Sequence, residues 1–249
     1  MDFDVLPGPP LAELARTTMA SVSAAVVTSA GSPALLPATV PVRAGRRGDP
    51  VLLPSPGSML ARHLAAGPAM VTVTVPAEAP FSALRLTGMT RPGVTQPGMT
   101  QPGITRSAMT WPDAPRDAYQ VVLNAVEFRG SVPTQVALAQ YEAAAPDPFR
   151  REAPAILRHL ERCHMTDLVG CVRAHGITAA EWVIPRRLDR FGLELLVLAP
   201  SGLAAVRLAF PGGPVSKTAD VPLSIRTILN CQCASESRQS EHLPWCSNP

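Results

Sequence analysis

Residues 152–176, EAPAILRHLERCHMTDLVGCVRAHG, decide the fold of the second half of the chain. Several side chains recur here at steps of three and four, a spacing that puts them on one face of a helix: Leu157, Leu160, His164, Leu168, Cys171 and His175. Pro154 suits the first turn of a helix, and Gly176 suits a left-handed C-cap. The stretch therefore predicts one continuous helix from Glu152 to Gly176.

The residues that follow predict a small antiparallel sheet on which this helix packs. Residues 181–188 and 193–198 have the composition of strands, and the intervening Asp189-Arg190-Phe191-Gly192 is typical of a hairpin turn. A third strand is expected over 204–210, and a closing helix over 220–230. The second half is thus predicted to be a small α/β domain.

Before residue 130 the sequence predicts many short strands and few helices. Helices are expected over 11–19 and 58–66, and strands over 21–29, 34–43, 51–53, 70–75, 81–87 and 119–130. The clearest strand runs from Met70 to Val75, where valine and threonine alternate and so face opposite sides of a sheet. Such a succession of strands is typical of an antiparallel barrel. A short helix over 136–145 follows it.

Three tandem pentads interrupt these strands: Arg91-Pro-Gly-Val-Thr95, Gln96-Pro-Gly-Met-Thr100 and Gln101-Pro-Gly-Ile-Thr105. The Pro-Gly pair in each pentad forbids a helix, and three pentads are too short for a solenoid. We therefore expect residues 88–115 to form a long loop inserted into the barrel. It is either an inert surface insertion, which we favour, or a functional lid.

The composition excludes several classes of function. A net charge of +3 is too small and too dispersed for a nucleic-acid-binding surface. The N-terminus lacks the features of a secretory signal, no apolar run is long enough to span a bilayer, and five cysteines without a regular framework favour reduced thiols. A cytoplasmic protein is expected. Nucleophile elbows, phosphate-binding glycine loops and zincin helices are absent from the sequence, which disfavours hydrolases and nucleotidases.

Two stretches of the sequence carry a resemblance to a known family. Residues 54–76, PSPGSMLARHLAAGPAMVTVTVP, place a serine-containing turn and a short helix before a valine-rich strand. In the second half, HLERCH at 159–164 is followed by LDRFGLEL at 188–195 and VRLAFPGGPV at 206–215. This order resembles a split β-barrel of the pyridoxamine-phosphate-oxidase type followed by a DUF2470-type domain. The same pairing occurs in haem-utilisation proteins of the split-barrel superfamily.

The resemblance implies an α+β fold: a split antiparallel β-barrel followed by a small α/β domain with a helix, a three-stranded sheet and a second helix. We expect the barrel over 1–147, including the loop 88–115, and the α/β domain over 148–230. Pro146-Asp147-Pro148 reads as the linker, and the polar residues 231–249 as a disordered tail. Members of this superfamily generally form homodimers that hold a ligand between the subunits, so a homodimer with a small-molecule or tetrapyrrole ligand is implied.

The resemblance also implies candidate cofactor-binding residues. His159 and His164 match the two histidines of the His-Met-Asn-x-Asp-His motif of the haem-utilisation proteins, although Cys163 replaces its aspartate. Ser58 and Arg62, with Arg43, match the positions that hold the flavin phosphate in FMN-binding split barrels. These residues indicate a haem-binding or haem-handling protein, with or without an oxidative activity. The alternatives are an FMN-dependent oxidoreductase and a ligand-free dimeric interaction module.

The spacing of the histidines leaves their role open. On one continuous helix, His159 and His164 lie about 140° apart around the axis, so they are not expected to bind one metal ion as a pair. His159, Cys163 and Asp167 follow one another at steps of four and have ligand-capable atoms, but we favour a structural stripe and predict no metal site. His164 is either a buried, hydrogen-bonded imidazole or a haem ligand.

Overall fold

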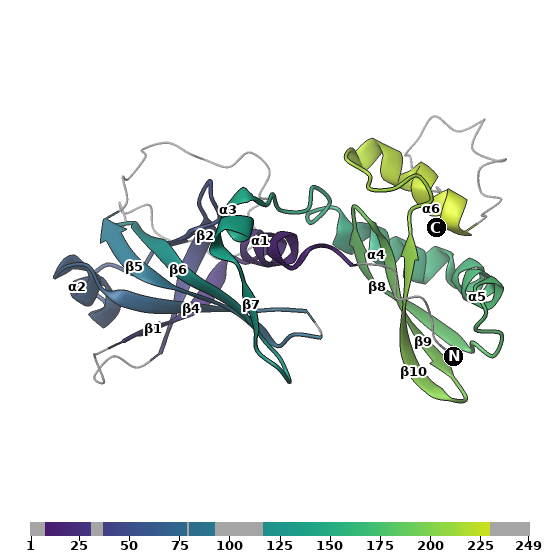
Figure 1. Ribbon diagram of the computed structural model, residues 1–249, viewed down its shortest axis with the longest axis horizontal. Helices are drawn as coiled ribbons and strands as arrows, with labels where there is room; N and C mark the ends of the chain where they lie inside the picture. Colours follow the sequence, from purple (N-terminus) through teal and green to yellow (C-terminus); the bar gives the residue numbers. More distant parts are fainter. Residues whose placement is uncertain (1–7, 31–36, 79, 93–116, 230–249) are drawn as a thin grey trace. The chain divides into compact units, whose positions relative to one another are not determined.

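The computed structural model describes residues 8–30, 37–78, 80–92 and 117–229 of the chain. These residues fold into two compact units, one formed by residues 11–146 and the other by residues 8–10 together with the residues from Asp147 onward. The fold is α+β, as predicted: the first unit is built on an antiparallel barrel and the second on a separate small sheet (Figure 1).

The first unit contains a closed antiparallel barrel of six strands with a seventh strand added at one edge. The strands are β1 (Ala24–Ser29), β2 (Ala38–Ala44), β3 (Pro50–Leu52), β4 (Met70–Pro76), β5 (Ala83–Pro92), β6 (Tyr119–Arg129) and β7 (Thr134–Val136). Their order is β3-β2-β1-β4-β5-β6-β7, and pairing of β3 with β6 closes the barrel. One end of β6 pairs with β3 and the other with β7.

Alternation of side chains along the strands builds the barrel core. In β4, Val71, Val73 and Val75 are buried while the threonines between them face outward. The pairing of β5 with β6 shifts between Thr87 and Gly88, where a Cβ on Gly88 would lie within 3.0 Å of the Val122 backbone. Glycine is therefore required at this irregularity.

The strand predicted over residues 70–75 is confirmed, because β4 spans Met70–Pro76.

Three helices accompany the barrel: α1 (Leu11–Ser21), α2 (Met59–Ala65) and α3 (Leu138–Ala143). Leu60 and Leu64 of α2 belong to the same core as the strands. Helix α2 begins at Ser58, whose hydroxyl accepts a hydrogen bond from the Ala61 N–H at 3.1 Å. Tyr141 of α3 is fully buried, and its hydroxyl donates to the Gly48 carbonyl at 2.8 Å.

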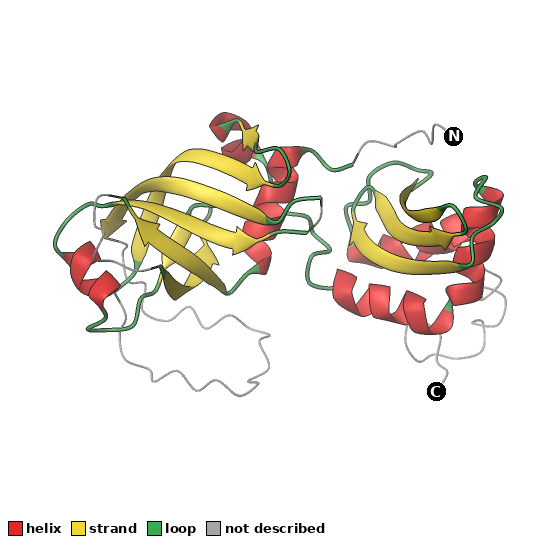
Figure 2. Cartoon of the chain, turned by 90° about the horizontal axis from the view of Figure 1, so that it is seen from below, coloured by secondary structure: helices red, strands yellow, loops and turns green. Residues whose placement is uncertain are grey.

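The second unit is a three-stranded antiparallel sheet with helices on one face (Figure 2). Its strands are β8 (Trp182–Asp189), β9 (Gly192–Ala199) and β10 (Gly202–Ala209), and its helices are α4 (Ala153–Cys163), α5 (Met165–Ala174) and α6 (Val221–Leu229), with a 3₁₀ turn η1 (Thr218–Asp220) before α6. Helices α4 and α5 both contact β8, and α5 contacts α6. The core of this unit includes Leu160, Leu168, Val183, Leu195 and Ile225.

The structure corrects the prediction of one continuous helix over 152–176. The chain leaves helical geometry at His164 (φ −126°, ψ 21°), which ends α4 and precedes α5. Leu160, Leu168 and Cys171 are buried as predicted, whereas His175 is exposed and follows the end of α5, with its Nδ1 2.9 Å from the Cys171 carbonyl oxygen. The predicted C-cap is confirmed, because Gly176 follows α5 with φ 97°.

Two further boundaries differ from the sequence-based expectations. Strand β5 continues through Gly88 to Pro92, so the loop that we expected to begin at residue 88 does not begin before residue 93. The pentads lie almost wholly outside the described residues, as does the predicted disordered tail 231–249. Asp147, expected in a linker, is only 3% exposed, and its carboxylate accepts hydrogen bonds from the N–H groups of Phe149 and Arg190. Asp147 is part of the second unit.

Among the described residues, no helix has both the length and the apolar character needed to cross a membrane.

Candidate functional site

The break between α4 and α5 brings the two predicted histidines together. The ring centroids of His159 and His164 are 5.1 Å apart, and the rings meet edge to face with an interplanar angle of 61°. On a continuous helix these side chains point about 140° apart. The non-helical backbone at His164 changes that direction, so the two rings lie in contact instead of on different sides of one helix; whether they bind one metal ion as a pair stays a prediction.

His164 is held in place by its surroundings. Its side chain is 9% exposed, and Nδ1 lies 3.0 Å from Oδ2 of Asp167 in the first turn of α5. A carboxylate on one ring nitrogen fixes the orientation of an imidazole and directs the other nitrogen elsewhere. Asp167 also lies where the N-terminus of α5 favours negative charge. An acidic residue three positions after His164 is thus the sequence signal that indicates a helix start here.

His159 differs from His164 in exposure and charge. It lies on α4, is half-buried, and its pKa is lowered by burial and by the neighbouring His164. The lowered pKa favours the neutral imidazole, which is the form that binds a metal ion or haem iron. Of the two histidines, His159 is the more accessible one.

The other ligand-capable side chains of this region do not join the histidine pair in a metal cluster. Cys163 is exposed at the end of α4. Within the part of the chain that the structure describes, no group of three or more His, Cys, Asp or Glu side chains is arranged to hold a metal ion. A site at the α4–α5 junction therefore has histidine nitrogens as its principal donors.

Two of the predicted flavin-phosphate residues lie one turn apart on α2, and the third lies on β2. The Ser58 hydroxyl already caps α2, while Arg62 is exposed on that helix and Arg43 is exposed on β2. Among the described residues, no hydrogen bond or ion pair links these three side chains. His63, also on α2, lies with its Nε2 2.9 Å from the Ser29 hydroxyl at the end of β1.

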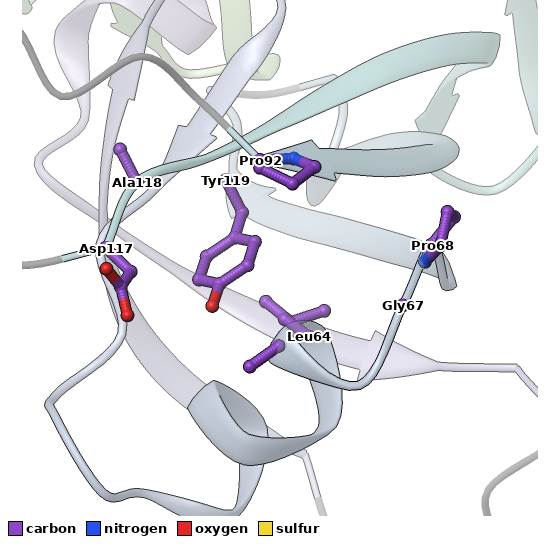
Figure 3. A pocket seen from close by; sticks show the side chains of 8 residues that line it. Leu64, Gly67, Pro68, Pro92, Asp117, Ala118 and Tyr119 are labelled. Atoms are coloured by element: carbon purple, nitrogen blue, oxygen red, sulfur yellow. The ribbon is translucent and has the colours of Figure 1, made fainter.

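A pocket that sequence reasoning missed lies at the end of the barrel, beside the C-terminal turn of α2 (Figure 3). Its volume is about 310 Å³, and it is lined by Leu64, Ala65, Gly67, Pro68, Pro92, Asp117, Ala118 and Tyr119. These residues come from three separate segments of the chain, and no motif connects them. Only the closure of the barrel brings them together, so no signal in the sequence marks this site.

Comparison with known proteins bears on the fold. No protein-family model matches the chain, and no curated protein matches it significantly in sequence. The structure is similar to that of a haem-binding protein from Mycobacterium smegmatis, with 20% sequence identity, a TM-score of 0.62, and coverage of 90% of this chain and 98% of that one. It also aligns with Atu2129, a protein of unknown function from Agrobacterium tumefaciens str. C58, over 92% of this chain and 100% of that one, with 16% identity and a TM-score of 0.39. The first similarity supports a split-barrel-like fold. The DUF2470 assignment of the second unit stays a prediction.

Proposed function

We propose that this protein binds a haem-type tetrapyrrole and that the imidazoles at the α4–α5 junction supply the iron ligand. The observation that carries the proposal is the contact between His159 and His164, with ring centroids 5.1 Å apart. Support comes from the haem-binding protein whose fold aligns with 90% of this chain. Haem iron takes four ligands from its porphyrin, so one or two imidazoles complete its coordination.

The donor chemistry of the two histidines fits this group. His159 is half-buried and favours the neutral form, so it is the side chain that ligates the iron. His164 is oriented by Asp167 and packs against His159. This contact limits the directions that the His159 ring adopts. When bound, haem supplies the iron and its redox chemistry, whereas the protein residues supply binding and orientation.

Titration of the purified, ligand-free protein with haemin tests this function. We expect a sharpened Soret band at about 400 nm, with saturable binding. His159→Ala should lower the affinity at least about tenfold, because a coordinate bond is lost. His175→Ala is the matched control, since this histidine is exposed in the same unit, and it should bind haem as the unchanged protein does.

His164→Ala and His164→Gln separate a ligand from a structural imidazole. A structural His164 makes the Ala variant less stable by about 1–3 kcal/mol and the Gln variant less so, because Gln retains a donor and an acceptor. If both variants lose haem while the fold stays intact, His164 is the ligand instead of His159. Equal haem affinity for His159→Ala, His164→Ala and the unchanged protein would overturn the proposal. Flavin absorption bands at about 370 and 450 nm in the purified protein would instead show that the protein binds FMN.

A homodimer is part of this function, and its expected interface is the outer face of the barrel. Met70, Met89 and Val122 are paired across β4, β5 and β6 and form an outward-facing apolar row. Met89 and Val122 are each 37% exposed. A second copy that covers this row removes apolar surface from water. Light scattering of the unchanged protein should give the mass of a dimer. Val122→Asp should lower the measured mass toward that of the monomer. If the unchanged protein has the mass of a monomer, the homodimer proposal is wrong.

A further inference from the structure

The pocket at the end of the barrel has apolar walls with two polar groups. Leu64, Ala65, Pro68, Pro92 and Ala118 supply aliphatic surface. The polar groups are the Asp117 carboxylate and the Tyr119 hydroxyl, and none of the lining residues carries a positive charge. A volume of about 310 Å³ lies at the lower end of the range of small-molecule sites. The pocket is therefore sized for a compact organic molecule.

Tyr119 places a polar group in the wall of this pocket. The residue as a whole is only 5% exposed, but among the described residues its hydroxyl is not one of the buried polar atoms that lack a hydrogen-bond partner, so the pocket leaves this hydroxyl accessible. Figure 3 shows the hydroxyl directed into the space between Asp117 and Leu64. An accessible hydroxyl on an otherwise apolar wall is a group that orients a ligand through a hydrogen bond.

The charge of the lining decides what kind of molecule fits. Asp117 lies close enough to Tyr119 that, together with burial, its negative charge raises the pKa of the phenol. The hydroxyl therefore stays protonated at neutral pH, and its oxygen is a second, weaker hydrogen-bond acceptor beside the carboxylate. Two neighbouring acceptors, one of them ionised, favour a ligand with a charged N–H donor. A ligand anion meets the Asp117 carboxylate and is repelled.

We propose that this pocket binds a small organic cation: a protonated amine that pairs with Asp117 and Tyr119 and carries an apolar group against Leu64, Pro68 and Pro92. The amine nitrogen donates to the carboxylate and to the phenol oxygen, while the apolar group covers the aliphatic walls. The residues of this site belong to the barrel unit, whereas the histidine pair belongs to the second unit.

Three probes of similar size and different charge test the proposal on the full-length, haem-free protein by calorimetric titration at neutral pH. They are phenethylamine, phenethyl alcohol and phenylacetate. Haem is left out because amines also bind its iron. We expect phenethylamine to bind about tenfold more tightly than phenethyl alcohol, the difference that a charge-assisted hydrogen bond gives, and phenylacetate to bind most weakly.

Variants then locate the binding. Asp117→Asn keeps the shape of the side chain and should remove the preference for the amine, whereas Glu142→Gln, at an exposed carboxylate on α3, should leave it unchanged. Tyr119→Phe should weaken amine binding several-fold while the fold is retained. Ala65→Phe, at an exposed lining position, should fill the pocket and weaken all three probes.

Three outcomes overturn the proposal. The first is equal affinity of the unchanged protein for the amine and the alcohol. The second is an Asp117→Asn variant that binds phenethylamine as Glu142→Gln does. The third is binding that appears only when residues 93–116, between the lining residues Pro92 and Asp117, are replaced by a short glycine-serine linker. In that case the pocket of the full chain is occupied by the chain itself.

Discussion

The strands of the barrel and the strands of the second unit differ in what they bury. Among the described residues of the barrel unit, the buried charged side chains are Glu13 and Arg16, and both belong to α1 rather than to a strand. The strands of the second unit bury Asp189 at the end of β8. Its carboxylate receives the Arg207 guanidinium and the Phe191 N–H, and Arg187 lies 3.6 Å away.

This difference shows two ways of specifying a fold. The barrel depends on many apolar side chains that alternate along its strands, so any single polar contact contributes little to its specificity. The second unit has a smaller sheet, and a buried carboxylate ties the β8–β9 turn to β10. Burying an ion pair costs desolvation free energy, and removing one partner leaves an uncompensated charge. The second unit should therefore be sensitive to single polar substitutions where the barrel is not.

The largest expected effect comes from breaking the buried ion pair. Asp189→Ala leaves Arg207, whose side chain is 9% exposed, with only the more distant Glu194 carboxylate at 3.9 Å, and should destabilise the second unit by up to about 3–5 kcal/mol. Hydrogen exchange read by mass spectrometry should show lost protection in β8, β9 and β10 with β4 and β5 unchanged. This readout is needed because a chain of two units need not unfold in one step.

The matched control is a surface ion pair of the barrel. Nη1 of Arg129 lies 2.9 Å from Oε1 of Glu127, and the two side chains are 45% and 20% exposed, respectively. Glu127→Ala should cost no more than about 1 kcal/mol, because solvent screens such a pair. If the two substitutions have equal effects, the contrast between the units is wrong.

The next effect tests the backbone packing of both units with the same substitution. A Cβ at Gly88 would lie within 3.0 Å of the Val122 backbone, and one at Gly192, where φ is 155°, would lie within 3.0 Å of the Leu208 carbonyl oxygen. Gly88→Ala and Gly192→Ala should each cost about 1–3 kcal/mol, confined to their own unit. Gly170→Ala is the control: this helical position has open space around it, so the variant should be about 1 kcal/mol more stable. Tolerance of Ala at both strand positions would show that the neighbouring strands move aside.

The barrel was predictable from sequence because its signal is local. Alternation of valine and threonine over Met70–Pro76 specifies both the strand and the face that it buries. The α+β class follows from the succession of such segments, and the structure confirms it. By contrast, the bulge that lets β5 continue past Gly88 depends on the approach of β6, which is distant in the sequence, and a glycine before the Pro-Gly pentads reads as the start of a loop.

The candidate sites were predictable only in part. His159 and His164 were identified from a resemblance, but periodicity continued the helix through His164, because an apolar spacing of three and four does not detect one non-helical residue. Asp147 lies between two prolines and reads as linker, yet its burial depends on the N–H of Arg190, which is 43 residues away. The pocket at Tyr119 depends on barrel closure and has no sequence signal at all.

A smaller effect is expected at a buried tyrosine hydroxyl of the barrel unit. The Tyr141 hydroxyl donates to the Gly48 carbonyl at 2.8 Å, and Arg16 lies over the ring, 5.4 Å from its centroid. Tyr141→Phe keeps the ring that lies under Arg16 but removes the hydroxyl, which donates to Gly48 and also interacts with the Arg16 guanidinium, so it should cost about 1–2 kcal/mol. Urea unfolding of the two proteins measures the difference. A loss as large as that of Asp189→Ala would show that the barrel unit also depends on a single polar contact.

The smallest effect is a change in how stability depends on pH, and it concerns Asp147. Burial raises the pKa of this carboxyl above its ordinary value of 3.8, despite the hydrogen bonds from the Arg190 and Phe149 N–H groups. Between 3.8 and the raised value, the folded protein binds more protons at this position than the unfolded chain does. The contribution of Asp147 to stability is therefore full below pH 3.8 and is lost as the pH rises through the raised pKa.

Asp147→Asn removes this titration, although it also adds a constant cost, because an amide has one acceptor oxygen where the carboxylate uses two. The measurement is the free energy of unfolding of the second unit for both proteins as the pH rises from 3.8, with hydrogen exchange in β8 and β9 as the readout. The stability of the unchanged protein relative to Asp147→Asn should fall with rising pH and then become constant. A relative stability that instead rises with pH would mean that the two N–H donors outweigh burial and that the carboxylate, not the acid, is the stabilised form. Asp147 would then act as Asp189 does, and the second unit would depend on two buried anions rather than one.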